Sequence, residues 1–322
     1  KIIMILKSEN NLSILANLSN KNIKKYLEIV VRQNNMELFV VNNPDLIGYA
    51  IIAQKPKYLI SNFKKLELDA LIGIGGDGSL KILQTLTAKG NINFIGIPKT
   101  IDNDVKHNEL SIGYDTAVDV ATNALDMLQP TAASHRRAMI LEVMGRDAGR
   151  IALNAGIAGG ADVILIPELP YSIKGIANHI DNIRSKGRNH ALIVVAEAVK
   201  KEDGKKATVK FVDGEVRLGG IGTYLGDEIY KLTDAETRVT VLGHVQRGAQ
   251  PTHRDRLIAS AFGVKAVDLI ANEKYNRVVV WQDRSVKDVS LDDIAGKSQT
   301  LSKKDPLIEV ARGLGIYIGE LS

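Results

Sequence analysis

The chain has 322 residues, of which 45% are hydrophobic and 25% charged, and its net charge is +5. This length exceeds one ordinary core, so we expect two domains. The absence of cysteines excludes disulfides and thiolate chemistry and predicts a cytoplasmic protein. The sequence has no basic tract of the kind that binds nucleic acid and no apolar run long enough to span a membrane, so neither partner is expected.

Short apolar stretches alternate with longer amphipathic ones along the chain. This alternation predicts an α/β fold of two doubly wound, Rossmann-like parallel-sheet domains with helices on both faces. In such a fold, ligands bind at the carboxyl ends of strands. A polar stretch at 200–206 predicts an exposed hairpin or loop, and a helix at 115–128 is expected to end before Pro130. The other predicted elements are strands at 2–6, 37–41, 71–74, 94–97, 138–143, 163–166 and 192–196, and a helix at 21–32.

A glycine-rich run, GIGGDGS at 73–79, separates a predicted strand from a helix expected to start at Leu80. Glycines let the backbone approach a phosphate closely, and N–H groups at a helix start attract anions. We therefore expect Gly76, Gly78 and Ser79 to contact phosphate. A carboxylate such as Asp77 tolerates a phosphate neighbour when a divalent cation lies between them. The run predicts a metal–phosphate site for phosphoryl transfer, and the alternative is a tight turn with a capping aspartate.

A second cluster, PKTIDND at 98–104, follows the next predicted strand and should open at the same edge as Asp77. One of its acids, Asp102 or Asp104, suits a base that takes a proton from an attacking hydroxyl, and the other suits a cation shared with Asp77. Lys99 adds positive charge where a transferring phosphate gathers negative charge. The alternative is a turn rich in Asp and Asn.

Two further clusters contain arginines near strand ends. They are EVMGR at 142–146, preceded by Arg136 and Arg137, and GHVQRG at 243–248, preceded by Arg238. Planar guanidinium groups match phosphate oxygens, so these arginines suit a phosphorylated substrate. Taken singly, each arginine fits a surface role and His244 fits a structural role.

Together the four clusters resemble the phosphofructokinase family, and the resemblance extends in order from about Asn62 to Ser322. It implies two doubly wound domains with the active site in the cleft between them. The implied donor and metal domain is 1–113 with 246–297 returning to it, and the implied sugar-phosphate domain is 114–245 with 298–322. The implied reaction is phosphorylation of fructose 6-phosphate to fructose 1,6-bisphosphate in glycolysis.

The resemblance also implies roles for single residues. Asp102 is the implied base, and Asp77 and Asp104 are the implied Mg²⁺ ligands. Thr100 and Arg146 complete the implied catalytic set with Lys99. The implied contacts to the sugar phosphate are Met144, Gly145, Arg137, Glu197, Arg238, His244 and Arg247. Arg137 and Arg238 are implied to reach a neighbouring subunit's substrate, which predicts a homo-oligomer, dimer or tetramer, with shared sites.

The donor is either ATP or pyrophosphate. Lys99 resembles the pyrophosphate-using branch, whereas Gly78 resembles the ATP enzymes, and the pair together resembles the mixed-substrate group. ATP is the favoured prediction. A third hypothesis is a catalytically weak regulatory subunit. It is motivated by the segment KSENN at 7–11, which stands where the family has a glycine turn against the donor phosphates, and it conflicts with the presence of all three acids.

Overall fold

The computed structural model describes residues 2–6, 38–41, 56–65, 67–210 and 216–320. The chain divides into two compact units. Unit 1 comprises Lys1–Asp115 and Gln250–Gln299, and unit 2 comprises Thr116–Ala249 and Thr300–Ser322. The chain therefore passes between the units three times, after residues 115, 249 and 299.

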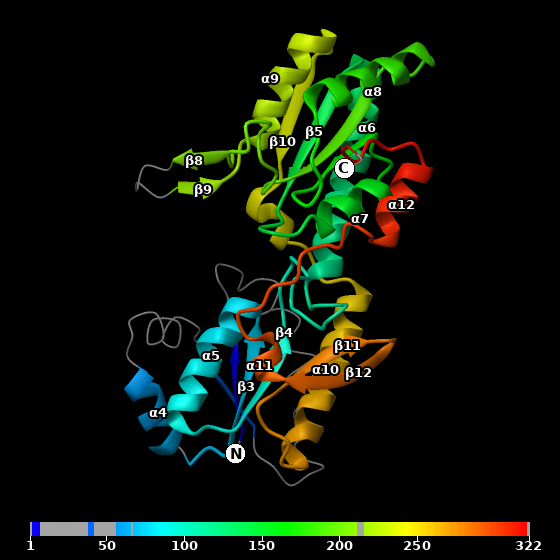
Figure 1. Cartoon of the computed structure of the whole chain (residues 1–322). Helices are drawn as coiled ribbons and strands as arrows, with labels where there is room; N and C mark the ends of the chain where they lie inside the picture. Colours follow the sequence, from blue (N-terminus) through cyan, green and yellow to red (C-terminus); the bar gives the residue numbers. More distant parts are fainter. Residues whose placement is uncertain (1, 7–37, 42–55, 66, 211–215, 321–322) are drawn as a thin grey trace. The chain divides into compact units, whose positions relative to one another are not determined.

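Each unit combines a parallel sheet with helices (Figure 1). The elements of unit 1 are β1 (Ile2–Leu6), β2 (Leu38–Val41), α4 (Pro56–Lys65), β3 (Ala70–Gly75), α5 (Asp77–Gly90), β4 (Phe94–Pro98), α10 (His253–Ala271), β11 (Arg277–Gln282), β12 (Ser285–Ser290) and α11 (Leu291–Ile294). The elements of unit 2 are α6 (Tyr114–His135, which starts at its border), β5 (Ala138–Val143), α7 (Arg150–Ala158), β6 (Val163–Leu165), α8 (Ile173–Ser185), β7 (Ala191–Ala196), β8 (Thr208–Lys210), β9 (Val216–Leu218), α9 (Ile221–Thr233), β10 (Thr237–Val241), the 3₁₀ helix η2 (Gly243–Arg247) and α12 (Pro306–Gly313).

The sheet of unit 1 has the strand order β12-β11-β4-β3-β1-β2. All neighbouring pairs are parallel except β11 and the edge strand β12. The chain leaves β1 for β2 on one side and then returns to β3 on the other side. The strand order thus reverses between β1 and β3, and ligands of open α/β sheets bind beyond the carboxyl ends of strands at such a switch point.

Alternate residues of the unit 1 strands bury opposite faces of this sheet. Ile72 and Ile74 of β3 lie in one hydrophobic cluster with Phe262 of α10. Leu71 of β3 and Phe94 of β4 lie in a second cluster with residues of α5 and α11. Figure 1 accordingly shows α5 and α10 on opposite sides of β3 and β4. Burial of both faces explains why these strands are continuous apolar runs.

The sheet of unit 2 is fully parallel, with the order β10-β5-β7-β6. Here β5 is flanked by β7 and β10, so the switch point lies between β5 and β10. Helix α9 packs closely on this pair, because a Cβ atom at Gly226 would lie 3.6 Å from Ile140 of β5. The prediction of an α/β fold with parallel sheets is confirmed.

Several predicted elements have the expected bounds. The strand predicted at 138–143 is β5, and the strands predicted at 163–166 and 192–196 differ from β6 and β7 by one residue. The stretch at 200–206, predicted as an exposed hairpin or loop, is closed by an antiparallel bridge between Lys200 and Lys206, as in a hairpin. The helix predicted at 21–32 and the segment at 7–11 lie outside the described residues.

The predicted end of the helix before Pro130 is wrong, because α6 continues through Pro130 to His135. Pro130 lies on the exposed side of the helix, where water can satisfy the carbonyl that its missing N–H leaves free. On the other side, Leu128 and Ala132 pack against Met139 and Leu192 of the sheet. Tertiary packing of the last turns therefore outweighs the local cost of the proline.

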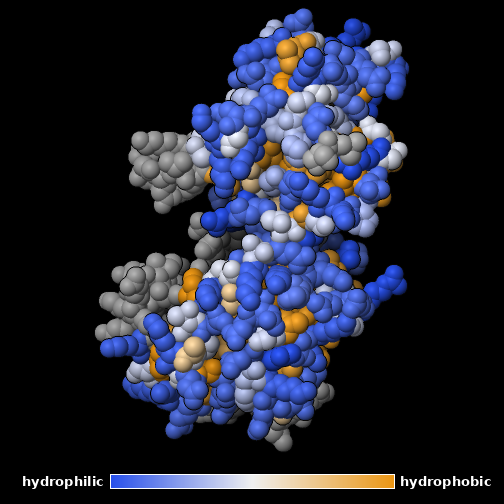
Figure 2. Space-filling model, viewed as in Figure 1, coloured by the Kyte–Doolittle hydropathy of each residue, from blue (hydrophilic) through white to orange (hydrophobic). Residues whose placement is uncertain are grey.

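Hydrophilic residues dominate the face of the molecule in Figure 2, and hydrophobic ones form small patches. No helix in the described part of the chain has the length and apolarity needed to cross a bilayer.

We predict that Phe262→Ala lowers the free energy of unfolding by about 3–5 kcal/mol. Phe262 is fully buried between α10 and β3, so truncation removes apolar contacts and leaves a cavity. Urea unfolding measures the change. The matched control is Val264→Ala on the same helix, where the side chain is 38% exposed and the expected change is less than about 1 kcal/mol. Equal losses in both variants would contradict this account of the core.

Candidate active site

The glycine-rich run forms the connection between β3 and α5. Strand β3 ends at Gly75, Gly76 is the N-cap in an extended conformation, and α5 begins at Asp77. The expected helix start at Leu80 is therefore wrong by three residues, because Asp77, Gly78 and Ser79 already form the first helical turn. This turn exposes backbone N–H groups at the positive end of the helix dipole, which is the arrangement that binds phosphate.

The turn is tight at one glycine and open at another. A Cβ atom at Gly75 would lie 2.5 Å from Cβ of Ser79, which forbids a side chain there without movement of the turn. At Gly78, no described atom lies within 4 Å of the corresponding position. Packing thus requires a glycine at 75, whereas the described residues leave open space beside the exposed Gly78.

The second motif lies against this turn because β3 and β4 are paired in register up to Gly75 and Pro98. The N–H of Lys99 donates to the carbonyl of Gly75 at 3.0 Å. A Cβ atom at Gly76 would lie 3.4 Å from Cβ of Thr100. The structure therefore brings the two predicted motifs together at the carboxyl edge of the unit 1 sheet.

A buried asparagine holds the acidic loop. Asn103 is 4% exposed and has a positive φ of 51°. Its amide donates to the carbonyl of Glu109 at 2.8 Å and accepts the N–H of Ser111 at 2.7 Å. Asp102 and Asp104 on either side are half-buried. The inward asparagine thus fixes the backbone from which the two acids project.

The acidic residues of unit 1 suit a metal that arrives with phosphate. No group of three or more His, Cys, Asp or Glu residues in the described ranges forms a ready-made metal cage. Mg²⁺ ordinarily binds through one or two carboxylates plus substrate phosphates and keeps several waters. Asp77 beside an open phosphate-binding turn, with Asp104 on the adjoining loop, fits this mode of binding.

In unit 2, the loop after β5 is held by two side chains. The N–H of Met144 donates to Oε1 of Gln246 at 2.8 Å, and the N–H of Gly145 donates to Oε1 of Glu197 at 3.4 Å. Gly145 has φ +148°, and a Cβ atom there would lie 2.9 Å from the carbonyl oxygen of Ala148. Only glycine therefore fits at position 145. The next residue of the loop, Arg146, is exposed.

The helix η2 adds His244 and Arg247 to this end of the sheet. Residues three apart in a 3₁₀ helix lie one above the other, so these two side chains share one face. The carboxyl ends of β5, β7 and β10 thus bring together Met144, Gly145, Glu197, His244 and Arg247, five of the predicted sugar-phosphate residues.

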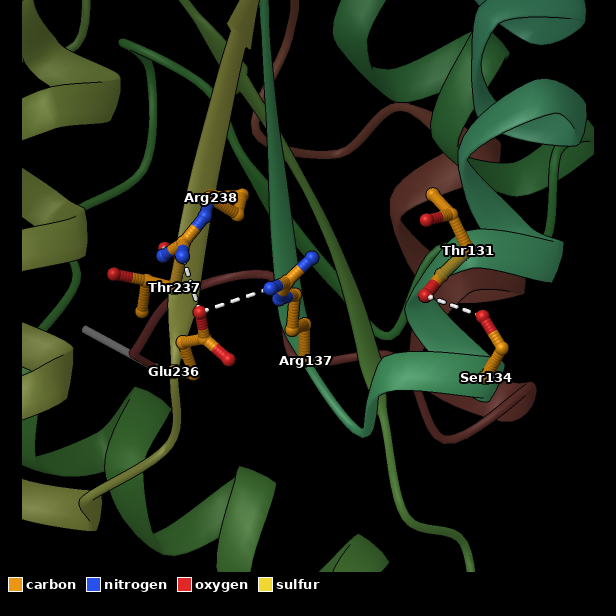
Figure 3. Close-up of polar contacts among 6 residues, drawn as sticks. All are labelled: Thr131, Ser134, Arg137, Glu236, Thr237 and Arg238. Atoms are coloured by element: carbon orange, nitrogen blue, oxygen red, sulfur yellow. Dashed lines mark hydrogen bonds and ion pairs between the residues drawn. The ribbon is translucent and has the colours of Figure 1, made fainter.

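Arg137 and Arg238 form a separate cluster. Both guanidinium groups donate to Oε1 of Glu236, at 3.0 Å for Arg137 (Figure 3). The hydrogen bond from Arg137, with the nearby charge of Arg238, holds the pKa of Glu236 below its ordinary value. Glu236 thus holds the two arginines side by side.

This arginine cluster lies at the amino ends of β5 and β10, because Arg137 precedes β5 and Arg238 is the second residue of β10. The six residues of β5 lie between Arg137 and Met144, so seven steps of about 3.3 Å separate the two, which corresponds to roughly 23 Å. One sugar phosphate cannot span that length. The structure therefore does not bring Arg137 and Arg238 to the other sugar-phosphate residues of the same chain.

Three residues that shape the site were not among the predicted site residues. Gln246 stands inside a quoted motif, but nothing in the sequence distinguishes its buried amide from a surface one. Glu142 is 2% exposed and accepts the N–H groups of Gly220 and Gly222 at the start of α9. Glu236 has no distinctive sequence signal, because its role depends on the pairing of β10 with β5.

Known proteins with similar sequences are kinases. Residues 50–270 match the family model described as Phosphofructokinase. The chain is 56% identical over 262 residues to "ATP-dependent 6-phosphofructokinase 1" of Nostoc sp., covering 81% of this chain and 73% of that protein. It is 52% identical over 268 residues to the protein of the same name from Synechocystis sp., covering 83% and 74%.

A solved structure with a similar fold is a pyrophosphate-dependent phosphofructokinase from Nitrosospira multiformis. Its TM-score is 0.78 at 18% identity, covering 94% of this chain and 86% of that one. The fold is that of a two-unit α/β protein, with a glycine-rich turn and an acidic loop at one edge of the unit 1 sheet. The chain belongs to the phosphofructokinase family.

We predict that Gly75→Ala lowers the stability of the protein, whereas Gly78→Ala does not. The added methyl at 75 meets Ser79, so that variant should lose about 1–3 kcal/mol of unfolding free energy. The methyl at 78 meets no described atom in a helical turn, so that variant should be unchanged or gain up to about 1 kcal/mol. Urea unfolding of both variants compares them. A large loss at Gly78 would mean that packing, rather than a ligand, requires that glycine.

Proposed function

We propose that this chain is an ATP-dependent 6-phosphofructokinase, which phosphorylates fructose 6-phosphate in glycolysis. The observation that carries the proposal is the contact between the two unit 1 motifs, which places Asp77 beside the loop of Asp102 and Asp104. The curated relatives at 45–56% identity are named ATP-dependent 6-phosphofructokinases, in agreement with the favoured prediction from the sequence.

In the proposed reaction, the 1-hydroxyl oxygen of fructose 6-phosphate attacks the terminal phosphorus of ATP. The new bond forms between that oxygen and phosphorus, and the bond to the ADP oxygen breaks. Asp102 accepts the hydroxyl proton, since a half-buried carboxylate on a fixed loop can act as a general base. Lys99, Thr100 and Arg146 stabilise the negative charge of the transferring group.

Asp77 and Asp104 are the proposed residues that hold Mg²⁺. When bound, Mg²⁺ neutralises the donor phosphates and keeps them beside the first turn of α5. The N–H groups of Gly78 and Ser79 and the N-cap Gly76 orient the same phosphates. Asp104 is kept in place by its neighbour Asn103 and by its own carbonyl, which accepts the N–H of Gln299 at 2.6 Å.

The open space beside Gly78 supports ATP as the donor. The two phosphates of pyrophosphate correspond to the two terminal phosphates of ATP. Only ATP has a further α-phosphate and a nucleoside, so only ATP needs additional space beside the turn. Lys99 remains the argument for pyrophosphate, because its charge can replace contacts that a nucleotide organises. The similar pyrophosphate-dependent structures are 18–20% identical and bear on the fold alone.

The separated arginine cluster supports a homo-oligomer with shared sites. Arg137 and Arg238 are held together by Glu236 at the opposite end of the β5–β10 pair from Met144. They are too far from the other sugar-phosphate residues to share one substrate molecule with them in the same chain. We propose that they bind the 6-phosphate of a neighbouring subunit's fructose 6-phosphate, and that the remaining sugar-phosphate residues bind within their own subunit. A cytoplasmic location remains a prediction.

We predict that the purified chain forms fructose 1,6-bisphosphate and ADP from fructose 6-phosphate, ATP and Mg²⁺. Asp102→Asn should lower kcat by about 10²–10⁴-fold, because the amide cannot accept the hydroxyl proton. Its KM for fructose 6-phosphate should change little, since the sugar-phosphate residues lie in unit 2. Steady-state kinetics with ATP and with pyrophosphate as the donor gives kcat and KM for the wild-type protein and for Asp102→Asn.

The matched control is Asp69→Asn, which should leave kcat unchanged, because Asp69 precedes β3 and lies at the amino edge of the unit 1 sheet, opposite the loop of Asp102. Turnover with pyrophosphate in place of ATP would reject the proposed donor. If neither donor supports turnover while fructose 6-phosphate binds, the regulatory-subunit hypothesis replaces the proposed enzyme. A near wild-type rate for Asp102→Asn would reject Asp102 as the base.

A further inference from the structure

We propose that Gln246 is a positioning residue that fixes the sugar-phosphate loop at 144–146, an inference that rests on the proposed function. Gln246 touches no reacting atom. It acts through the backbone of Met144, and its effect is on the binding of fructose 6-phosphate.

Both ends of the Gln246 amide have a backbone partner. The side chain is fully buried, Oε1 accepts the N–H of Met144 at 2.8 Å, and Nε2 donates to the carbonyl of Ala117 at 3.2 Å. These partners define the orientation of the amide, because the oxygen must meet the N–H and the nitrogen must meet the carbonyl. One side chain thus links η2, the loop after β5 and the start of α6.

The link lies at the switch point of the unit 2 sheet. Pairing between β10 and β5 ends at Val241 and Glu142, and the N–H of Leu242 donates to the carbonyl of Glu142 at 3.1 Å. Beyond this point the two segments separate. The segment after β10 forms η2, and the segment after β5 forms the loop at 144–146. Gln246 therefore continues the connection between the two strands where the ladder of backbone hydrogen bonds stops.

The position of Gln246 within η2 separates its role from that of its neighbours. His244 is exposed and Arg247 is half-buried on the same face, while Gln246 points inward. Helix η2 thus carries two predicted substrate residues, His244 and Arg247. Through Gln246 it is also bonded to the loop that carries a third, Met144. A change at 246 should alter the spacing of His244 and Arg247 from Met144 without removing any of them.

A second side chain in the described part of the chain also supports the loop. The N–H of Gly145 donates to Glu197 at 3.4 Å, a longer contact than that of Met144 with Gln246. Without the amide, the N–H of the half-buried Met144 loses its partner, which favours movement of the loop to find another one. The loss should therefore appear in substrate binding.

The test compares Gln246→Met with the wild-type enzyme. Methionine keeps the length of the side chain but provides neither hydrogen bond. The KM for fructose 6-phosphate should rise about tenfold, the effect of losing one buried hydrogen bond from binding. The KM for ATP should stay within twofold, since its proposed contacts lie in unit 1. If Gln246→Met does not fold, as judged by circular dichroism, Gln246→Asn is measured with the same expectation.

The matched control is Asp162→Asn. Asp162 is 7% exposed and accepts the N–H of Leu192 at 2.8 Å, at the amino end of the unit 2 sheet. This control should lower the melting temperature and leave the KM for fructose 6-phosphate within twofold. An unchanged KM in the Gln246 variants, or equal changes for both substrates, would overturn the positioning role.

Failure of the proposed function would appear in the wild-type protein itself. Fructose 6-phosphate binding is therefore also measured by calorimetry on the wild type and on Gln246→Met. Binding without turnover would reject the enzyme and still decide the role of Gln246 from the two affinities. No binding and no turnover in the wild type would overturn both proposals.

Discussion

The pairing of β3 with β4 is the constraint on which the donor side of this molecule depends. The two strands are parallel and in register up to Gly75 and Pro98, so the segments that follow them must leave the sheet at the same edge. Burial of both faces fixes that register, because a shift of one residue would turn Ile72 and Leu71 to the wrong faces. The glycine-rich turn and the acidic loop thereby become neighbours, although their acids are separated by more than 20 residues of sequence.

In unit 2, the pairing of β5 with β10 plays the same part as the pairing of β3 with β4 in unit 1. Their carboxyl ends carry the loop of Met144 and the helix η2, and their amino ends carry Arg137 and Arg238. One strand pair therefore presents two groups of predicted phosphate-binding side chains at its opposite ends. Under the proposed function, this polarity favours shared sites, since a single chain cannot close both groups around one small molecule.

The sequence predicts the strands well because burial on both faces produces continuous apolar runs, and it predicts the two unit 1 motifs because each directly follows such a run. It predicts less about side chains whose partners depend on strand order. Nothing local shows that Glu236 bridges two arginines or that the amide of Gln246 is buried, because β10 lies beside β5, about 100 residues earlier in the chain. The predicted end of the helix before Pro130 is wrong for a related reason. Packing of α6 on Met139 and Leu192 outweighs the local helix-breaking effect of the proline.

We propose that the acids at this edge of unit 1 hold the metal that accompanies the donor phosphates. The most direct measurement is the affinity for ATP with Mn²⁺, a paramagnetic substitute for Mg²⁺, followed by electron paramagnetic resonance. Wild-type protein is compared with Asp77→Asn and with Asp104→Asn. The account predicts that each substitution weakens Mn²⁺–ATP binding by about tenfold or more and leaves fructose 6-phosphate binding unchanged. Wild-type affinity for Mn²⁺–ATP in both variants would contradict the account.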